Sequence, residues 1–242
     1  INAVLRLVAR YGKLPLPEEL ARLARRDPQA FGPRALFSFR RAFEPPVIEE
    51  GFVAVERRPF VRETAHAASD DPPRAVLVDV DGALWSSRSG ARAPLDPADI
   101  VVDAAVASHL AALAARGAAI WGTSWQPRVA AGEATVAEVA SLGDALRARV
   151  GFDIVLRVCP HGAGPPVCWC RKPLPGLAVE LSMESGTNAS SVLAIGRTSL
   201  DRVAAARLGM RYLDARTVGE AGSVAAVDAL SGSGAAEPGE KK

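Results

Sequence analysis

Two carboxylates separated by one residue, Asp79 and Asp81, follow a short apolar run. The run 75–78 has the length and β-branched character of a strand that is buried on both faces of a parallel sheet. Side chains alternate along a strand, so both carboxylates are expected to point the same way at its carboxyl end, where open α/β sheets bind ligands. Two like charges at this spacing favour a bound cation or a shared proton. A plain strand that ends in the turn Asp81-Gly82 is the alternative, and the motif alone does not choose between them.

A second group of reactive side chains lies in the segment 159–170. It contains all three cysteines of the chain, Cys159, Cys168 and Cys170, together with His161. Three thiolates and one imidazole are a complete tetrahedral ligand set for Zn²⁺, with no open position for catalysis. Chance clustering of buried thiols is one alternative, and a disulfide that leaves one cysteine unpaired is another. The pattern favours a structural zinc that would hold the next segment, 171–173, rigid.

The elements that must position these groups follow a regular pattern from residue 74 onward. Short apolar segments alternate with helical segments, which predicts an α/β fold with a parallel sheet and right-handed crossovers. The polar stretch 84–99 is long enough to form a flap over a site. Strands are expected at 75–78, 117–122, 154–158, 191–195 and 210–213, and helices at 101–115, 134–150, 175–185 and 201–208.

The residues before this pattern are expected to form a small helical and β appendage. Residues 1–30 have a helical pattern, 31–50 look irregular, and the alternation in 51–56 predicts a strand. The chain starts at Ile1 without an initiator methionine, which suggests a fragment of a longer protein. The predicted organisation is an appendage over 1–62 from an upstream domain, a linker over 63–73, a main domain over 74–220 and a disordered low-complexity tail over 221–242.

Phenylalanines 31, 37, 39 and 43 lie among arginines in the appendage. Such a mixture could stack on the bases of a single-stranded nucleic acid, so a nucleic-acid contact over 25–62 is one hypothesis. The favoured interpretation is that these residues anchor the appendage to its neighbour.

The composition is that of a folded protein without a global charge bias. The chain has 242 residues, 49% of them hydrophobic and 23% charged, and a formal net charge of +2. This content supports a sizeable core, and the charge does not call for a nucleic-acid partner. No apolar run approaches the roughly 18 residues of a membrane span, and no signal-peptide pattern is present. The sequence therefore predicts a cytoplasmic protein with no membrane partner.

The spacing of the polar residues resembles a known family. Asp79-Val-Asp81-Gly82, Thr123, Lys172 and the pair Gly196…Asp201 are similar, in order, to the four motifs of haloacid-dehalogenase-type (HAD) phosphatases. The cysteine segment and the Arg-Lys-Pro-Leu-Pro-Gly that follows it resemble the zinc loop of the subgroup with histidinol-phosphate and heptose-bisphosphate phosphatases. The resemblance covers about 74–215.

A looser resemblance concerns the appendage. Residues 1–62 look like the end of a P-loop kinase domain fused to such a phosphatase, as in bifunctional polynucleotide kinase-phosphatases. The sequence contains no Gly-x-x-x-x-Gly-Lys-Ser/Thr loop, so this chain cannot bind ATP in the P-loop manner.

The HAD resemblance implies a Rossmann-like fold and a mechanism. Asp79 would attack phosphorus and form an aspartyl-phosphate, and Asp81 would protonate the leaving oxygen and then activate water. Thr123 would donate a hydrogen bond to the phosphate, and Lys172 would balance the negative charge. The further residues expected to bind substrate are Ser124 and Arg171.

The resemblance also implies a Mg²⁺ ion held by Asp79, the main-chain carbonyl of Asp81 and a later acid, Asp201. The chain departs from the family pattern here, because Arg197 stands where the usual metal-binding aspartate belongs. The loss of an anionic ligand and the nearby guanidinium should both weaken Mg²⁺ binding.

Two functional hypotheses follow. The first is a Mg²⁺-dependent phosphomonoester hydrolase that acts on a small phosphorylated metabolite or a nucleic-acid 3′-phosphate, next to a kinase-like domain of the same protein. The alternative is a catalytically impaired HAD-like domain that serves as a binding or regulatory module for that kinase-like domain, because of Arg197.

Overall fold

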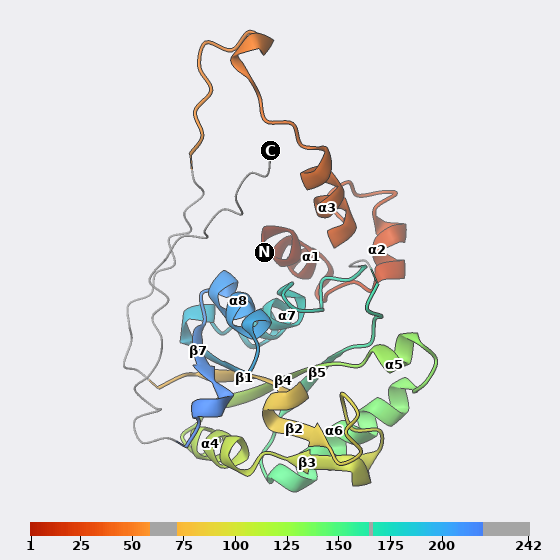
Figure 1. The fold of residues 1–242 in the computed structure, drawn as a ribbon, viewed down its shortest axis with the longest axis vertical. Coiled ribbons are helices and arrows are strands. Elements are labelled where there is room, and N and C mark those ends of the chain that lie inside the picture. The colour runs from red at the N-terminus through yellow and green to blue at the C-terminus, as the bar shows by residue number, and fades with distance from the viewer. Residues whose placement is uncertain (59–71, 165–166, 220–242) are drawn as a thin grey trace.

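The computed structural model describes residues 1–58, 72–164 and 167–219. Its centre is a five-stranded parallel sheet with the order β5-β4-β1-β6-β7 (Figure 1). The next two strands of the sheet along the chain lie on one side of β1 and the last two lie on the other. This reversal leaves a crevice at the carboxyl end of β1, where sheets of this type bind ligands. The strands are β1 (Ala75–Asp79), β4 (Ala119–Trp125), β5 (Val155–Cys159), β6 (Val192–Gly196) and β7 (Arg211–Asp214).

Helices cover both faces of the sheet, so the main domain has three layers. Figure 1 shows α4 (Ala104–Ala115) and α6 (Val136–Val150) on one face, and α7 (Gly176–Ser185) and α8 (Ser199–Leu208) on the other. In β1, Val76 and Val78 pack into the core under α4 and α6, and Ala75 packs under α7 and α8. Because side chains alternate along a strand, Asp79 at the end of β1 lies on the α7–α8 side. The predicted α/β fold with a parallel sheet is confirmed.

A hairpin separates β1 from α4. The strand β2 (Trp85–Ser87) pairs antiparallel with β3 (Ile100–Val102), and the loop between them ends in a 3₁₀ turn, Pro97–Asp99. We call residues 88–99 the flap. The sequence predicted a polar connection at this place but not the two strands. The helix predicted from residue 101 begins at Ala104 because Asp103 caps it, with its Oδ1 accepting from the Val106 N–H at 3.1 Å.

The first helices of the chain pack on the main domain. The helices α1 (Asn2–Tyr11) and α2 (Pro17–Leu23) form a core with Trp169 and with Val179 of α7. Phe31 supports this contact, since its ring meets Trp169 edge-on with centroids 6.3 Å apart.

Two predictions for the appendage are wrong. Residues 33–42 form a helix, α3 (Pro33–Ala42), because Pro33 at the first helical position is pre-organised for a helix start. The strand expected over 51–56 does not form, and Val53 is fully exposed, because no described strand lies beside it to pair. Phe37, Phe39 and Phe43 are exposed, so of these four phenylalanines only Phe31 anchors the appendage.

The remaining short elements are α5 (Pro127–Ala130) and the 3₁₀ turns Ile48–Glu50, Ala189–Ser191 and Ala215–Thr217. Most of the predicted linker, and the predicted tail at 221–242, lie outside the described residues. Among the helices that the structure describes, none has the length and apolar character needed to cross a membrane.

Candidate functional site

The carboxyl ends of β1 and β4 bring together the first predicted site residues. Asp79 is paired in register with Thr123 of β4, and the two residues are each 8% exposed. The Lys172 Nζ lies 2.6 Å from the Asp79 Oδ1 and forms a second ion pair with the Asp201 Oδ1. These four residues line one cavity of about 60 Å³. Residues from four separate segments of the chain therefore converge at the crevice of the sheet.

Asp81 lies just beyond β1, in a turn over Val80–Leu84 whose backbone is not helical at Asp81 and Gly82. Gly82 has a φ of 79° in this turn, a conformation that favours glycine. The Asp81 carboxylate accepts three hydrogen bonds, from the Trp85 Nε1 at 3.0 Å, the Ser124 Oγ at 2.8 Å and the Trp125 main-chain N–H at 2.6 Å. The turn and these bonds, rather than strand alternation, therefore determine where the carboxylate points.

Burial sets the proton affinities of both acids. It raises the pKa of Asp79 to about 7, although the neighbouring Lys172 acts in the opposite direction; Asp201 and Asp81 raise the Asp79 pKa further. Burial also raises the pKa of Asp81, against the lowering effect of its three hydrogen bonds. Burial by itself would lower the pKa of Lys172, but the carboxylates of Asp79 and Asp201 outweigh it, so that this pKa is raised. The site thus contains more buried carboxylate than ammonium, which favours a cation or a proton.

Asp201 is held in the first turn of α8. Its Oδ2 accepts from the Thr198 N–H at 2.9 Å, the Thr198 Oγ1 at 2.7 Å and the Arg197 N–H at 3.2 Å. A Cβ at Gly196 would lie 2.5 Å from the Asp201 Cβ, so glycine permits this close approach. Asp201 therefore caps its helix with one oxygen and pairs with Lys172 through the other.

Arg197 points away from this carboxylate cluster. Its Nη2 lies 2.5 Å from the Oδ2 of Asp103, the residue that caps α4. Lys172 pairs with Oδ1 of Asp79, so Oδ2 is the oxygen of this carboxylate that could hold Mg²⁺. Mg²⁺ sites often contain one or two carboxylates, with the other positions taken by water and substrate phosphate. The residues present therefore fit the ion, with fewer anionic ligands than the sequence motif calls for.

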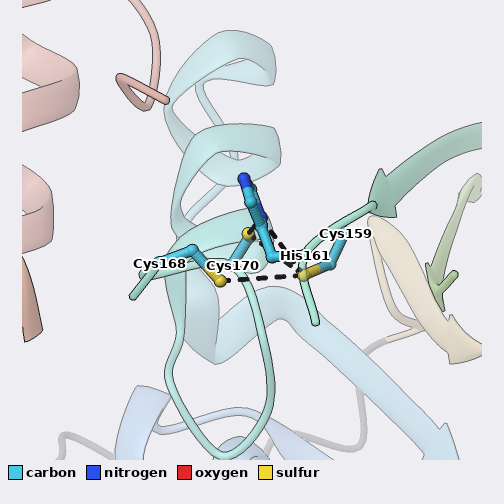
Figure 2. A group of neighbouring side chains, drawn as sticks. All are labelled: Cys159, His161, Cys168 and Cys170. Atoms are coloured by element: carbon cyan, nitrogen blue, oxygen red, sulfur yellow. Dashed lines mark hydrogen bonds between the residues drawn. The ribbon is translucent and has the colours of Figure 1, made fainter. Parts of the chain in front are cut away.

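The cysteine segment forms a compact cluster beside this cavity. Figure 2 shows the side chains of Cys159, His161, Cys168 and Cys170 pointing toward one another, and their ligand atoms all lie within 4.8 Å of each other. Four of the Sγ–Sγ and Sγ–Nδ1 distances within the cluster lie between 3.2 and 3.7 Å. Tetrahedral ligands with Zn–S bonds of about 2.3 Å lie roughly 3.5–3.8 Å apart. All three cysteines are free thiols, so the geometry fits a zinc site and not a disulfide.

The cluster also positions the lysine. Cys159 and Cys170 line the same cavity as Asp79, and Lys172 comes two residues after Cys170. The Gly176 N–H donates to the Trp169 main-chain carbonyl at 2.9 Å and closes the loop on which Lys172 lies. The cysteine loop therefore lies at the tip of β1, as the sequence hypothesis requires.

Three residues of the site, Trp85, Arg92 and Trp125, were not singled out from the sequence. Trp85 is 2% exposed and donates to Asp81. The guanidinium carbons of Arg92 and Arg171 lie 4.2 and 4.3 Å from the ring centroid of Trp125. The position of Trp125 directly after Thr123-Ser124, at the end of a strand, was the signal that could have identified it. Nothing in the sequence near Arg92 indicated its contact.

Comparisons with known proteins place the fold. No protein-family model matches the chain, and no curated protein matches it in sequence. The structure is similar to that of D,D-heptose 1,7-bisphosphate phosphatase from B. bronchiseptica, complexed with magnesium and phosphate. The TM-score is 0.50 at 22% identity, over 57% of this chain and 77% of that chain. A structure described as a HAD-like phosphatase from Mesorhizobium loti has a TM-score of 0.50 at 24% identity, over 58% of this chain and 71% of that one. At these identities the likeness shows the fold alone: the chain shares the Rossmann-like α/β architecture of these two structures.

Proposed function

We propose that this chain is a phosphomonoester hydrolase that acts through Asp79. The observation that carries the proposal is the ion pair of 2.6 Å between Lys172 and Asp79, at the carboxyl end of the central strand and beside Thr123. A buried carboxylate next to a fixed ammonium and a hydroxyl can receive a phosphate group, because the ammonium and the hydroxyl compensate its negative oxygens. The fold that the chain shares with two phosphatase structures supports this assignment.

The reaction would proceed in two steps. In the first, an ionised Asp79 oxygen attacks phosphorus, the ester bond breaks, and Asp81 gives a proton to the leaving oxygen. In the second, Asp81 takes a proton from water, which attacks the aspartyl-phosphate and releases inorganic phosphate. Burial raises the pKa of Asp81, which suits a carboxyl group that must hold a proton. Lys172 favours the ionised form of Asp79.

Asp79 and the main-chain carbonyl of Asp81 would hold Mg²⁺. When bound, this ion would neutralise negative charge on the phosphate group. Asp201 was expected to be a further ligand. In the structure its oxygens accept from Lys172, Thr198 and Arg197, so its direct role would be to orient Lys172. Cys159, His161, Cys168 and Cys170 would hold a structural Zn²⁺ that keeps the loop before Lys172 in place.

The substrate would be a small phosphorylated metabolite or a polynucleotide 3′-phosphate. Thr123, Ser124 and Arg171 line the cavity and would contact it. The two similar structures are described as phosphatases, one of them for a phosphorylated sugar. We further propose that a kinase-like domain upstream in the same protein is a partner of this domain.

A second candidate function is a catalytically impaired binding or regulatory module. The observation that favours it is the side chain of Arg197, which replaces an anionic ligand and pairs with Asp103. Such a module would bind a phosphate group at the same cavity without turning it over.

The test is the hydrolysis of p-nitrophenyl phosphate by the zinc-loaded protein, with and without added Mg²⁺. Asp79→Asn is the matched control, because it keeps the size of the side chain and removes the nucleophile. We expect Mg²⁺-dependent release of phosphate by the wild type and a loss of at least about a hundredfold in the variant. Equal rates for the two proteins would exclude Asp79 as the nucleophile. Phosphate binding without hydrolysis would favour the second candidate.

A further inference from the structure

The four residues of the cysteine cluster are held from two directions. Cys159 is the last residue of β5 and so belongs to the central sheet. Its main-chain carbonyl accepts from the Gln126 N–H at 2.9 Å, directly after β4. The main-chain carbonyl of His161 accepts from the indole Nε1–H of Trp125, the last residue of β4, at 2.7 Å. The main domain therefore holds the first two ligands.

Trp169 lies between the other two ligands, and its side chain is buried against the appendage. The residue is 3% exposed and belongs to the core of α1 and α2, whereas Cys168 and Cys170 belong to the buried group of thiols. Its indole Nε1–H donates to the main-chain carbonyl of Phe31 at 3.0 Å. The buried apolar residues that the appendage contributes to this core are Val4, Leu7, Val8, Leu20 and Ala30. The appendage therefore holds the second pair of ligands through one side chain.

Leu14, in the connection between α1 and α2, makes a second contact with the loop. It packs against the core around Trp169 and also against the buried group of thiols. Its N–H donates to the Glu180 Oε1 of α7 at 2.9 Å, which fixes the connection on the main domain. The appendage therefore contacts the loop on the side of the sulfur atoms as well.

The two pairs of ligands are separated by residues 162–167, which contain two glycines. Bringing Cys168 and Cys170 to Cys159 restricts the backbone between them, and this restriction costs conformational entropy. A site that is already assembled binds its ligand more tightly, because part of the ordering cost no longer falls on binding. Contacts that keep the second pair in place should therefore raise the affinity for a metal ion.

We propose that zinc binding is coupled, through Trp169, to the packing of α1 and α2 on the main domain. Coupling of this kind is reciprocal: packed helices raise the affinity for zinc, and bound zinc strengthens the packing by the same factor. Because Lys172 comes two residues after Cys170, Trp169 is then a positioning residue for this lysine. The inference rests on the zinc ion assigned under the proposed function, and on hydrolysis only for the role of Lys172.

The first test is the zinc affinity of the whole chain, measured by competition with a chromophoric chelator at a temperature where each variant is folded. Leu7→Ala removes a buried side chain of α1 that packs in the core of Trp169 and is not part of the buried group of thiols. Trp169→Ala removes the link from the other side. We expect about five- to hundredfold weaker zinc binding in each variant, the range of a typical coupling energy.

The matched control is Leu110→Ala, because Leu110 is an equally buried leucine of α4 in the core on the opposite face of the sheet. It should destabilise the protein as a cavity in the core does, and its zinc affinity should stay within about twofold of the wild type. The double variant Leu7→Ala/Trp169→Ala should bind zinc no more weakly than the weaker single variant, since both changes break the same link. Equal zinc affinities of Leu7→Ala and Leu110→Ala would overturn the coupling.

The reciprocal effect can be measured on the wild type, so it decides the proposal even if Leu7→Ala does not fold. Removal of zinc by a chelator should accelerate hydrogen exchange at the Leu7 and Val8 amides of α1 by about five- to hundredfold. The Leu110 and Leu113 amides of α4 should exchange at an unchanged rate. Unchanged exchange in α1 would overturn the coupling. Equal acceleration in both helices would also overturn it, because zinc would then support the whole fold.

Hydrolysis of p-nitrophenyl phosphate separates this inference from the proposed function. If the wild type does not hydrolyse the ester, the proposed function fails, and the zinc affinities and exchange rates still decide the coupling. A wild type that takes up no zinc would overturn the coupling whatever its rate of hydrolysis. In an active protein, added zinc should restore the rate of Leu7→Ala but not that of Lys172→Met. A Leu7→Ala rate that zinc does not restore would overturn the positioning of Lys172 through Trp169.

Discussion

The guanidinium of Arg197 pairs with the carboxylate of Asp103, Nη2 to Oδ2 at 2.5 Å. The two residues are far apart in the sequence, and they meet because β6 lies beside β1 and the segment after β1 leads into α4. Asp103 also accepts from the Val106 N–H, so the same carboxylate caps α4 and holds the arginine. The pair keeps a positive charge at the rim of the site instead of inside the carboxylate cluster.

Arg197→Asp should therefore strengthen Mg²⁺ binding. The change removes a cation and adds an oxygen ligand next to Gly196, so we expect at least about a tenfold lower half-saturating Mg²⁺ concentration for phosphate release. Titration of the hydrolysis rate with Mg²⁺ measures this. Asp103→Asn is the control, because it frees Arg197 without adding a ligand, and it should not lower the Mg²⁺ requirement. A large gain in rate on Arg197→Asp would mean that the natural chain is impaired. An unchanged Mg²⁺ requirement would mean that position 197 does not contact the ion.

His161→Ala should reduce the zinc content and the thermal stability together. The purified wild type is expected to contain about one equivalent of zinc, because its four ligand atoms suit one tetrahedral ion. His109→Ala is the matched control, since His109 lies on α4, outside the cluster. Metal analysis and thermal unfolding in the same buffer measure both effects. A wild type without zinc, or equal losses in the two variants, would contradict the assignment of the cluster.

Gly176→Ala should destabilise the protein, although alanine usually favours a helix. A Cβ at this position would lie 2.5 Å from the Trp169 main-chain oxygen, and a backbone atom cannot yield as a flexible side chain can. Overpacking of this kind typically costs about 1–3 kcal/mol, and it would shift the loop that carries Lys172. The free energy of unfolding in urea measures the cost. Gly164→Ala is the control, because its added Cβ would meet no atom within 4 Å. Equal stability of the two variants would show that α7 can move away from the loop.

The flap should loosen in acid. Hydrogen bonds from the Leu95 and Ser89 N–H groups and the Ser89 hydroxyl lower the pKa of Asp99, against the effect of burial. A carboxyl whose pKa is lowered by folding stabilises the folded form above its unfolded pKa of about 4, and this stabilisation is lost as the pH falls through the lower folded value. Hydrogen exchange at the Ser89 and Leu95 amides should therefore become faster, relative to the intrinsic rate, below about pH 4.

Asp99→Asn is the control for this pH effect, because an amide does not titrate in the acid range. Its exchange at the same two amides should show no corresponding change between about pH 6 and pH 3. The same acid response in both proteins would assign the loosening to another group.

Local patterns in the sequence were enough for the alternating elements. The strands end within three residues of their predicted ends, because buried apolar runs and helical periods are local signals. Elements that depend on a neighbour were not predictable in this way. α3 lies in a segment of mixed residue types, β2 and β3 exist only through their mutual pairing, and residues 51–56 alternate but have no described strand beside them.

The sequence by itself determined which side chains could do chemistry: the acids at 79 and 81, the hydroxyl at 123, the lysine at 172 and the cysteine and histidine ligands. Residue type and spacing are local properties, so one chain was sufficient to name these candidates. Only the tertiary structure decided that Lys172 pairs with both Asp79 and Asp201, that Arg197 turns to Asp103, and that Trp125 joins the flap to the cysteine loop. These contacts connect segments that are distant in the sequence, and the direction of a long side chain depends on which partner the packed sheet and helices place within its reach.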